Sequence, residues 1–346
     1  MRGGPLRPAA WRPRLRGLGL VLLVWAALAG ADGGDPEPTQ AQLPAAGPVV
    51  VERFAKPGPL AGVLARIDLR DPRIRVKLVM ADGGGAAGGG APVECPGQLD
   101  VPSATARKHD LAVAVNASFF KAAPRRVGER QVPYAIGTCG SPVGWHFSEG
   151  QLRARPAEAA FKATLVVHAS GRVSLHASLD QLPADVAYAV SGNAMVLEGG
   201  RTVARSSSAI RHPRTAVGVS RDGASLLLVV VDGRQDGHSR GASLTELGDL
   251  MKDLGAHGAI NLDGGGSTVM VIKDRATGVF AVANSPSELA AEVPGVHLER
   301  PVVDVLGVLL REPLPAPATR PVGTEPPESV RAPGLGFPAA AGILEP

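Results

Sequence analysis

The sequence predicts one large domain of the α+β or mixed α/β class, in which a strand-rich mixed sheet contains a βαβ unit and few helices. Short runs rich in Val, Leu and Ile recur between turn signals, which is typical of strands. One segment instead spaces its apolar residues at helical intervals behind a capping box. About 260 residues lie between two flanks of low apolar content, enough for one large core or two small ones.

The predicted strands follow one another along most of the chain. They cover residues 62–69, 74–80, 111–115, 163–168, 187–190, 216–219, 226–231, 259–262, 269–272 and 305–310. The clearest helix begins after Ser243, which forms a capping box with Glu246 and leads into an apolar stripe that ends at Gly255. A weaker helical pattern covers residues 99–108.

The segment 226–262 contains strand, loop, helix and strand, so it predicts a βαβ unit with two parallel strands and a right-handed crossover. Asp232 follows the first strand and Asp263 follows the second. Both carboxylates should therefore lie on the same edge of the sheet. Neighbouring strands lie about 4.8 Å apart and next-but-one strands about twice that. Both spacings fall near the roughly 5 to 9.5 Å between the paired carboxylates of glycosidases.

The stretch Asn261-Leu262-Asp263-Gly264-Gly265-Gly266-Ser267 is the strongest local indication of a site. Three successive glycines suggest positive φ values or a close approach that a Cβ would block. Asn261 and Asp263 alternate with apolar residues, so they should share one face of the strand. The alternative is a tight connection between strands in which Asp263 is a turn residue.

Two further segments supply candidate binding residues. Asn116 ends an apolar strand and is expected at the same edge, although an Asn that ends a strand in an Asx-turn is the alternative. Arg211 and Arg214 flank a rigid proline and predict an anion clamp, against the alternative of an exposed basic turn. The histidines His212, His238 and His257 lack metal-ligand spacing, so no metal site is predicted.

The amino terminus predicts export. Residues 1–31 contain five arginines and no acids around an apolar run, which is typical of a signal peptide, with a single-pass anchor as the alternative. Without these residues the net charge falls from +4 to −1, because five positive charges are removed. A nucleic-acid partner therefore loses its main support. Residues 32–48 predict a disordered linker, residues 313–346 a disordered Pro-rich tail, and residues 84–90 a flexible loop.

The sequence holds two cysteines, Cys95 and Cys139. An even count in an exported chain predicts one disulfide, and two unpaired thiols are the alternative.

Taken together, these segments resemble the phosphodiester glycosidase family over most of residues 110–310. The resemblance rests on motifs in the right order, at residues 116–120, 211–218, 231–234, 261–267, 284–287 and 299–301. It implies hydrolysis of a sugar phosphodiester, with Asp232 and Asp263 as the catalytic carboxylates. The residues expected to bind substrate are Asn116, Arg214, Asn261, Gly264, Gly265, Gly266, Ser267 and Arg300; no cofactor is expected.

The chain departs from this family's pattern at two positions. Ser118 stands where a glycine is usual, and Asp304 replaces a small or amide residue after Glu299-Arg300-Pro301. Neither change removes a predicted catalytic group. Ser118 is expected to narrow the pocket and to change which sugar fits.

The function predicted from the sequence is an exported glycosidase that acts on a glycosyl-1-phosphate diester, on envelope or exopolysaccharide glycans, without stable membrane insertion after signal cleavage. One alternative is a non-catalytic envelope protein that binds polysaccharide, although the chain has only three Trp and two Tyr for aromatic platforms. The other is a metal-dependent phosphodiesterase with Asp232 and Asp263 as ligands. A Gly-x-Ser-x-Gly nucleophile elbow and a phosphate loop ending in Gly-Lys-Ser/Thr are both absent from the sequence.

Overall fold

The structure is a computed structural model that describes residues 47–82, 95–128, 130–157, 161–204, 210–289 and 295–311. All of them belong to one contact unit. The predicted signal peptide, nearly all of the predicted linker, the glycine tract and the Pro-rich tail lie outside these residues. Within the described part of the chain, no helix has the length and apolar character needed to cross a lipid bilayer.

The first sheet carries the predicted catalytic residues. Its seven strands follow the order β1-β2-β18-β17-β19-β15-β16, and each pairs with its neighbours in antiparallel fashion. The bounds are β1 Val49–Lys56, β2 Leu60–Asp68, β18 Ser225–Val231, β17 Arg214–Val219, β19 Gly258–Asn261, β15 Ala194–Glu198 and β16 Arg201–Thr202.

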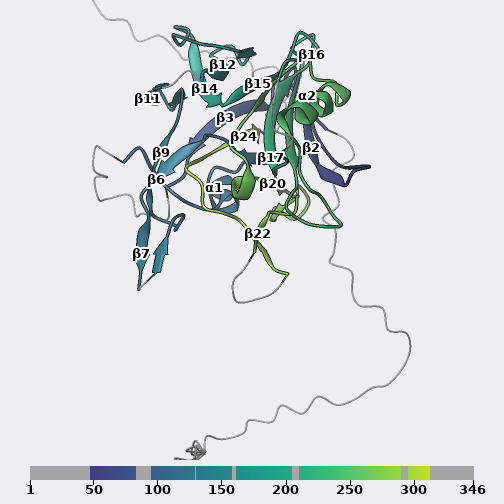
Figure 1. Cartoon of the computed structure of the whole chain (residues 1–346). Coiled ribbons are helices and arrows are strands. Elements are labelled where there is room, and N and C mark those ends of the chain that lie inside the picture. Colours follow the sequence, from purple (N-terminus) through teal and green to yellow (C-terminus); the bar gives the residue numbers. More distant parts are fainter. Residues whose placement is uncertain are drawn as a thin grey trace, which may run out of the picture. The chain divides into compact units, whose positions relative to one another are not determined.

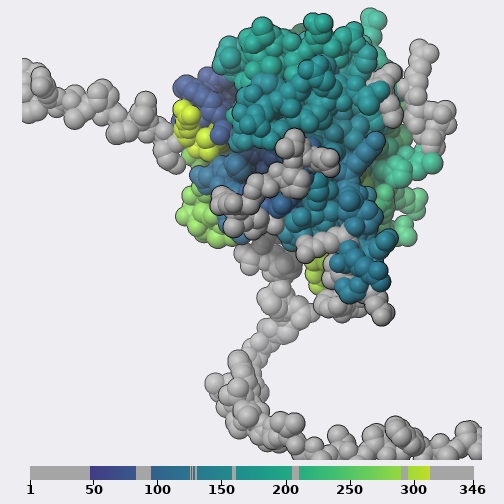
Figure 2. Space-filling model, turned by 90° about the vertical axis from the view of Figure 1, so that its left-hand side faces the viewer, coloured from purple at the N-terminus to yellow at the C-terminus, as the bar shows by residue number. Residues whose placement is uncertain are grey.

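A second sheet has the order β21-β20-β5-β24-β3, and a third has the order β11-β10-β14-β12-β13. The second contains β21 Phe280–Val282, β20 Met270–Lys273, β5 Val113–Asn116, β24 Asp304–Leu310 and β3 Ile74–Met80. The third contains β11 Gln151–Ala154, β10 His146–Ser148, β14 Val186–Gly192, β12 Ala163–His168 and β13 Val173–His176. Figure 2 shows residues of this third sheet, in teal, gathered on one face above earlier segments in blue.

Shorter pairings complete the described strands. They comprise β4 Gly97–Gln98, β9 Cys139–Pro142 and β6 Phe120–Ala122 in one small sheet, β7 Arg125–Val127 with β8 Arg130–Val132, and β22 Glu288–Leu289 with β23 His297–Leu298. Every named strand pair in the described residues is antiparallel.

The main core lies where the inner faces of the three sheets meet. Its fully buried side chains include Leu228 of the first sheet, Leu306 of the second and Leu165 of the third. The strands that carry them, β18, β24 and β12, are buried over most or all of their length. The described residues form two α-helices, which cover outer faces (Figure 1): α2 (Leu244–Asp253) packs on the first sheet, and α1 (Pro102–Lys108) lies against the second.

The prediction of a strand-rich fold with few helices is confirmed, but the βαβ unit is not. Strands β18 and β19 do not pair, because β17 lies between them and runs antiparallel to both. They consequently point in the same direction as next-but-one strands of an antiparallel sheet. Their ends still share one edge, which preserves the expected placement of the residues that follow them.

Both helix predictions are confirmed, with a shorter first helix. The Ser243 hydroxyl accepts from the amide of Glu246, and the Glu246 carboxylate accepts from the amide of Ser243, which completes the predicted capping box of α2. Helix α1 begins at Pro102 because residues 99 and 100 bond elsewhere: Leu99 donates to the carbonyl of Thr138, and Asp100 forms a bridge with Val302.

The two cysteines form the predicted disulfide. Cys95 and Cys139 are bonded, with their Cα atoms 5.5 Å apart and a sequence separation of 44. The bond ties the segment that precedes β4 to the start of β9.

Candidate active site

Three predicted site residues meet at one edge of the first sheet. Strand β18 ends at Val231, which pairs with Arg214 at the start of β17, and Ala216 of β17 pairs with Asn261 at the end of β19. Asp232 follows the first of these strands, and Asp263 follows the last. Arg214 thus lies between the two acidic residues, whose strands are separated by two spacings of about 4.8 Å each.

Asn116 joins the second sheet to this edge. The residue is buried at the end of β5, and its Nδ2 donates to the backbone carbonyl of Asp263 at 2.6 Å. Its Oδ1 accepts from the Thr215 hydroxyl at 2.7 Å and from the Val269 amide at 3.2 Å. The side chain therefore bonds to protein groups on both sides and holds the peptide that carries Asp263.

Asp263 has the most perturbed carboxyl group of the site. Desolvation by burial raises its pKa from 3.8 to about 6, and the nearby charge of Asp304 acts in the same direction. Hydrogen bonds from the Ser267 hydroxyl and the Gly264 amide, together with the charge of Arg300, favour the ionised form and limit the rise. This carboxyl group can exchange a proton near neutral pH, as a general acid or base must.

The three glycines after Asp263 are needed for the close contacts that the sequence predicts. A Cβ on Gly264 would meet the carbonyl oxygen of Pro213 at 2.7 Å, and Gly265 has a φ of +63°. A Cβ on Gly266 would overlap the side chains of Glu288 and Arg300. Two of the predicted amide donors bond within the protein, since Gly264 donates to the Asp263 carboxylate and Gly265 to the Pro213 carbonyl.

Asp232 is buried, and both of its carboxylate oxygens have partners. Oδ1 accepts from the side-chain amide of Asn284 at 2.9 Å and from the backbone amide of Ser285 at 3.0 Å. Oδ2 lies 2.8 Å from Nε2 of His238, whose side chain is 47% exposed. Asp232 therefore orients an accessible imidazole, as the carboxylate does in catalytic Asp-His pairs.

Arg214 is partly buried in the middle of the edge. Its Nε donates to the carbonyl of Ala242 at 2.9 Å, and burial lowers the pKa of its guanidinium from the usual value. The neighbouring His212 has a pKa lowered by burial and by the charges of Arg214 and Arg234. Positive charge is thus concentrated here, beside a histidine that favours its neutral form.

Arg300 approaches from the segment before β24. It forms an ion pair with Glu288, and its guanidinium lies 4.5 Å from the ring centroid of Tyr134. Its charge lowers the pKa of Asp263. The guanidinium is therefore close enough to act on the reaction centre while two neighbours fix its position.

Asn261 is fully buried below the edge. Its Nδ2 donates to Oδ1 of Asn193 at 2.8 Å and to the carbonyl of Leu262 at 2.9 Å. Asn116 bonds to the Asp263 carbonyl and Asn261 to the neighbouring Leu262 carbonyl, whereas Ser267 and Arg300 act on the Asp263 carboxyl group. The structure thus brings all predicted site residues to one edge and places the two asparagines in its support.

Several residues of this edge have no distinct local signal in the sequence. His238, Asn193 and His146 belong to this group. Asn284 and Ser285 do lie in a motif of the resemblance, which could have indicated their contact with Asp232. Among the residues that the structure describes, no group of three or more His, Cys, Asp or Glu side chains is arranged to hold a metal ion.

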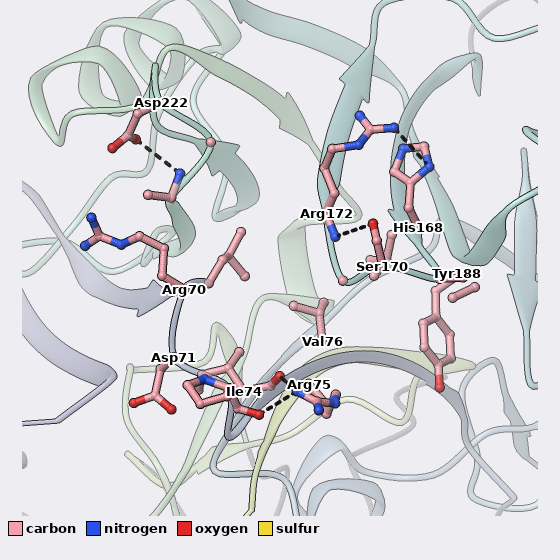
Figure 3. Close-up of a pocket in the computed structure, with 18 residues that line it drawn as sticks. Arg70, Asp71, Ile74, Arg75, Val76, His168, Ser170, Arg172, Tyr188 and Asp222 are labelled. Atoms are coloured by element: carbon pink, nitrogen blue, oxygen red, sulfur yellow. Dashed lines mark hydrogen bonds between the residues drawn. The ribbon is translucent and has the colours of Figure 1, made fainter.

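A cavity of about 710 Å³ lies at the opposite end of the sheets, far along the strands from the carboxylates. Figure 3 shows it among Arg70, Arg75, Arg172 and Tyr188. Its two acidic residues are held locally, Asp71 by Arg73 and Asp222 by Ser220 and the Ala224 amide. The cavity therefore lacks an available acid pair, and the chemistry favours the other end.

Comparisons with known proteins show which family the chain belongs to. Residues 109–309 match the family model described as phosphodiester glycosidase. The catalytic domain of zebrafish N-acetylglucosamine-1-phosphodiester alpha-N-acetylglucosaminidase, auto-inhibited by its pro-peptide, has a similar fold, with a TM-score of 0.55 at 22% identity over 76% of this chain and 82% of that one.

A protein of Burkholderia pseudomallei is also similar in fold, with a TM-score of 0.52 at 18% identity over 72% of this chain and 74% of that one. The search of curated proteins gives no match. The family model covers more than half of the sequence and includes every predicted site residue. The chain therefore belongs to the phosphodiester glycosidase family and is a glycosidase-type hydrolase.

Proposed function

We propose that this protein is an exported glycosidase that hydrolyses a glycosyl-1-phosphate diester on an envelope or extracellular glycan. The observation that carries the proposal is the order Asp232, Arg214, Asp263 across three adjacent strands of one sheet edge. A cation between two acids suits a substrate whose phosphate adjoins the reacting sugar carbon. The predicted leader and the disulfide support export.

Charge stabilisation is the main task in this reaction. A phosphomonoester is a good leaving group, with a second pKa of about 6, and needs little proton donation. Arg214 is placed to hold the phosphate, and Arg300 adds positive charge nearby. Removing such a donor from a preorganised site typically costs two to three orders of magnitude in rate.

Asp263 serves as the base that activates water. Its carboxyl group has a pKa of about 6, so it is ionised above that pH and can accept a proton from water. Asp232 holds His238 on the other side of Arg214, where the imidazole can donate a proton to the leaving oxygen. The strands of the two acids are next-but-one neighbours, about 9.6 Å apart, and the proposed mechanism is inverting, with the water between the two groups.

The proposal is tested with a panel of glycosyl phosphodiesters in oxygen-18 water. Label in the sugar, with inversion at the anomeric carbon by proton NMR, is the expected result. Label in the phosphate would mean cleavage of the phosphorus-oxygen bond and would support the metal-dependent phosphodiesterase. Binding of sugar without turnover would support the binding protein instead.

Variants test the roles of the two acids. Asp232→Asn and Asp263→Asn should each lower kcat by at least about 1,000-fold while circular dichroism stays unchanged. His238→Gln should lower kcat by about 100-fold, and in the Asp232→Asn background it should add little, because the two residues act as one unit. Additive losses of kcat in the double variant would show that His238 and Asp232 act independently.

A further inference from the structure

The two positions at which this sequence departs from the family pattern contact each other. Asp304, the first residue of β24, is fully buried, and its Oδ1 accepts from the Ser118 amide at 2.8 Å. Its Oδ2 accepts from the Ser118 hydroxyl at 2.5 Å. These residues are 186 positions apart in sequence. A carboxylate at 304 thus has a matching hydroxyl donor at 118.

A histidine from the third sheet completes the cluster. Nε2 of His146 lies 2.9 Å from Oδ2 of Asp304, and both side chains are fully buried. The direction of this contact is not that of a hydrogen bond, and neither imidazole nitrogen has a hydrogen-bond partner among the described residues. Burying such groups is costly without compensation. The Asp304 carboxylate is the polar group that lies within reach of this imidazole.

This cluster is joined to Asp263 through the backbone. Ser118 follows Ala117, whose carbonyl accepts from the amide of Asp263 at 3.0 Å. Asn116, one residue earlier, donates to the Asp263 carbonyl at 2.6 Å. Residues 116 and 117 therefore hold both sides of the Asp263 peptide, and Asp304 fixes the end of the segment that holds it.

We propose that Asp304 is a positioning residue which, held by Ser118 and His146, fixes the peptide of Asp263 and places a negative charge behind its carboxyl group. The proposal rests on the proposed function, in which Asp263 is the base. The charge of Asp304 disfavours ionisation of Asp263 and so raises its pKa.

The other groups around this pair act in known directions. Arg300, the Ser267 hydroxyl and the Gly264 amide favour the ionised Asp263, while burial opposes it. His146, on β10, faces Asp304, and Glu288 forms an ion pair with Arg300. The charge of Asp304 thus raises the pKa of Asp263, and its removal has a predictable sign.

The test is the titration of Asp263 followed by carbon-13 NMR of labelled aspartate, with the signal assigned by its loss in Asp263→Asn. Asp304→Asn should lower the Asp263 midpoint by at least about half a unit, because a like charge is removed. The matched control is Asp253→Asn, which removes an exposed carboxylate on α2 and should leave the midpoint unchanged. An unchanged midpoint in a folded Asp304→Asn protein overturns the proposal.

Ser118→Ala keeps the test decisive where Asp304→Asn does not fold. It removes the hydroxyl donor but keeps the carboxylate, so hydrogen exchange at the Asp263 amide should become several-fold faster. With substrate, kcat should fall while KM stays constant. Wild-type exchange and wild-type kcat would overturn the proposal.

These readouts separate the two proposals. A shifted midpoint in a protein that turns over no phosphodiester supports the role of Asp304 and rejects the function. Turnover of a phosphodiester with an unmoved midpoint does the reverse.

Discussion

The two ends of the first sheet hold their charged groups in different ways. At the far end, around the cavity, Asp68 bonds to Arg70 and Asp71 to Arg73, each two residues along the chain. At the reactive end, Asp232 bonds to Asn284, 52 residues away, and Asn116 reaches Asp263 across 147 residues. Ion pairs between residues close in sequence can neutralise surface charges within a single turn. Long-range contacts need the whole fold, and they fix groups with the accuracy that catalysis requires.

This difference also shows why the size of a cavity is a poor guide to the site. The larger of the two cavities described lies among locally paired side chains. The reactive edge is marked instead by a carboxyl group with a strongly raised pKa and by polar side chains buried beneath it. A strongly shifted pKa, in a group that residues distant in sequence hold in place, is a better indicator of function than the size of a cavity.

The largest contrast between the ends should appear on replacing one arginine from each. Arg214→Ala should lower kcat/KM for a glycosyl phosphodiester by about 100- to 1,000-fold, because the phosphate loses its central cation. The same change should have a smaller effect on an aryl glycoside, which carries no phosphate. Arg172→Ala, at the cavity, is the control and should stay within about twofold. Equal losses of kcat/KM on both substrates would show that Arg214 does not bind the phosphate.

A second contrast concerns the free energy of unfolding. Asn116→Ala should cost about 2 to 4 kcal/mol, because it leaves the Thr215 hydroxyl, the Val269 amide and the Asp263 carbonyl without their partner. Asp68→Asn at the far end should cost less than about 1 kcal/mol, as exposed ion pairs contribute little. Urea denaturation of both variants gives the comparison. Similar costs would show that the two ends are equally supported.

A smaller effect follows from pH. The folded pKa of Asp263 is raised to about 6, so kcat/KM should rise with pH through about 6 as the base ionises. Stability runs the other way: the raised pKa favours the folded state fully below pH 3.8, and this contribution is lost as pH rises through 6. Asp263→Asn should therefore gain roughly 1 to 3 kcal/mol relative to wild type between pH 4 and pH 8. Thermal unfolding at several pH values measures this difference in stability between Asp263→Asn and wild type. A difference that does not change with pH would show that the pKa of Asp263 is not near 6.

Much of the fold was predictable because its strands are apolar runs or alternate apolar with charged residues. Residues 74–80 and 163–168 match β3 and β12 in full, and the helix cap at Ser243 is confirmed. Strand β1 was missed because its positions alternate between buried and exposed. Strand β15 was missed because it is short. The βαβ prediction does not include Asp222-Gly223, which is a hairpin signal between β17 and β18. This hairpin makes the two strands antiparallel neighbours.

The site divides in the same way. The end of a strand is a local property, so Asp232, Asp263 and Asn116 could be expected at one edge from sequence. The pairing of Ser118 with Asp304 and the contact of both with His146 depend on how three sheets meet, and no spacing in the chain encodes that. Their unusual residue types were visible in the sequence, but the contact between them was not.

The all-antiparallel, long-range pairing of the sheets also has a kinetic consequence. Chains dominated by contacts between distant residues close large loops before they gain stabilisation, and they typically fold in milliseconds to seconds. The candidate site draws on residues from 116 to 304, so a partly folded chain has not yet assembled it. Catalytic competence should therefore appear late, after the last sheet has docked.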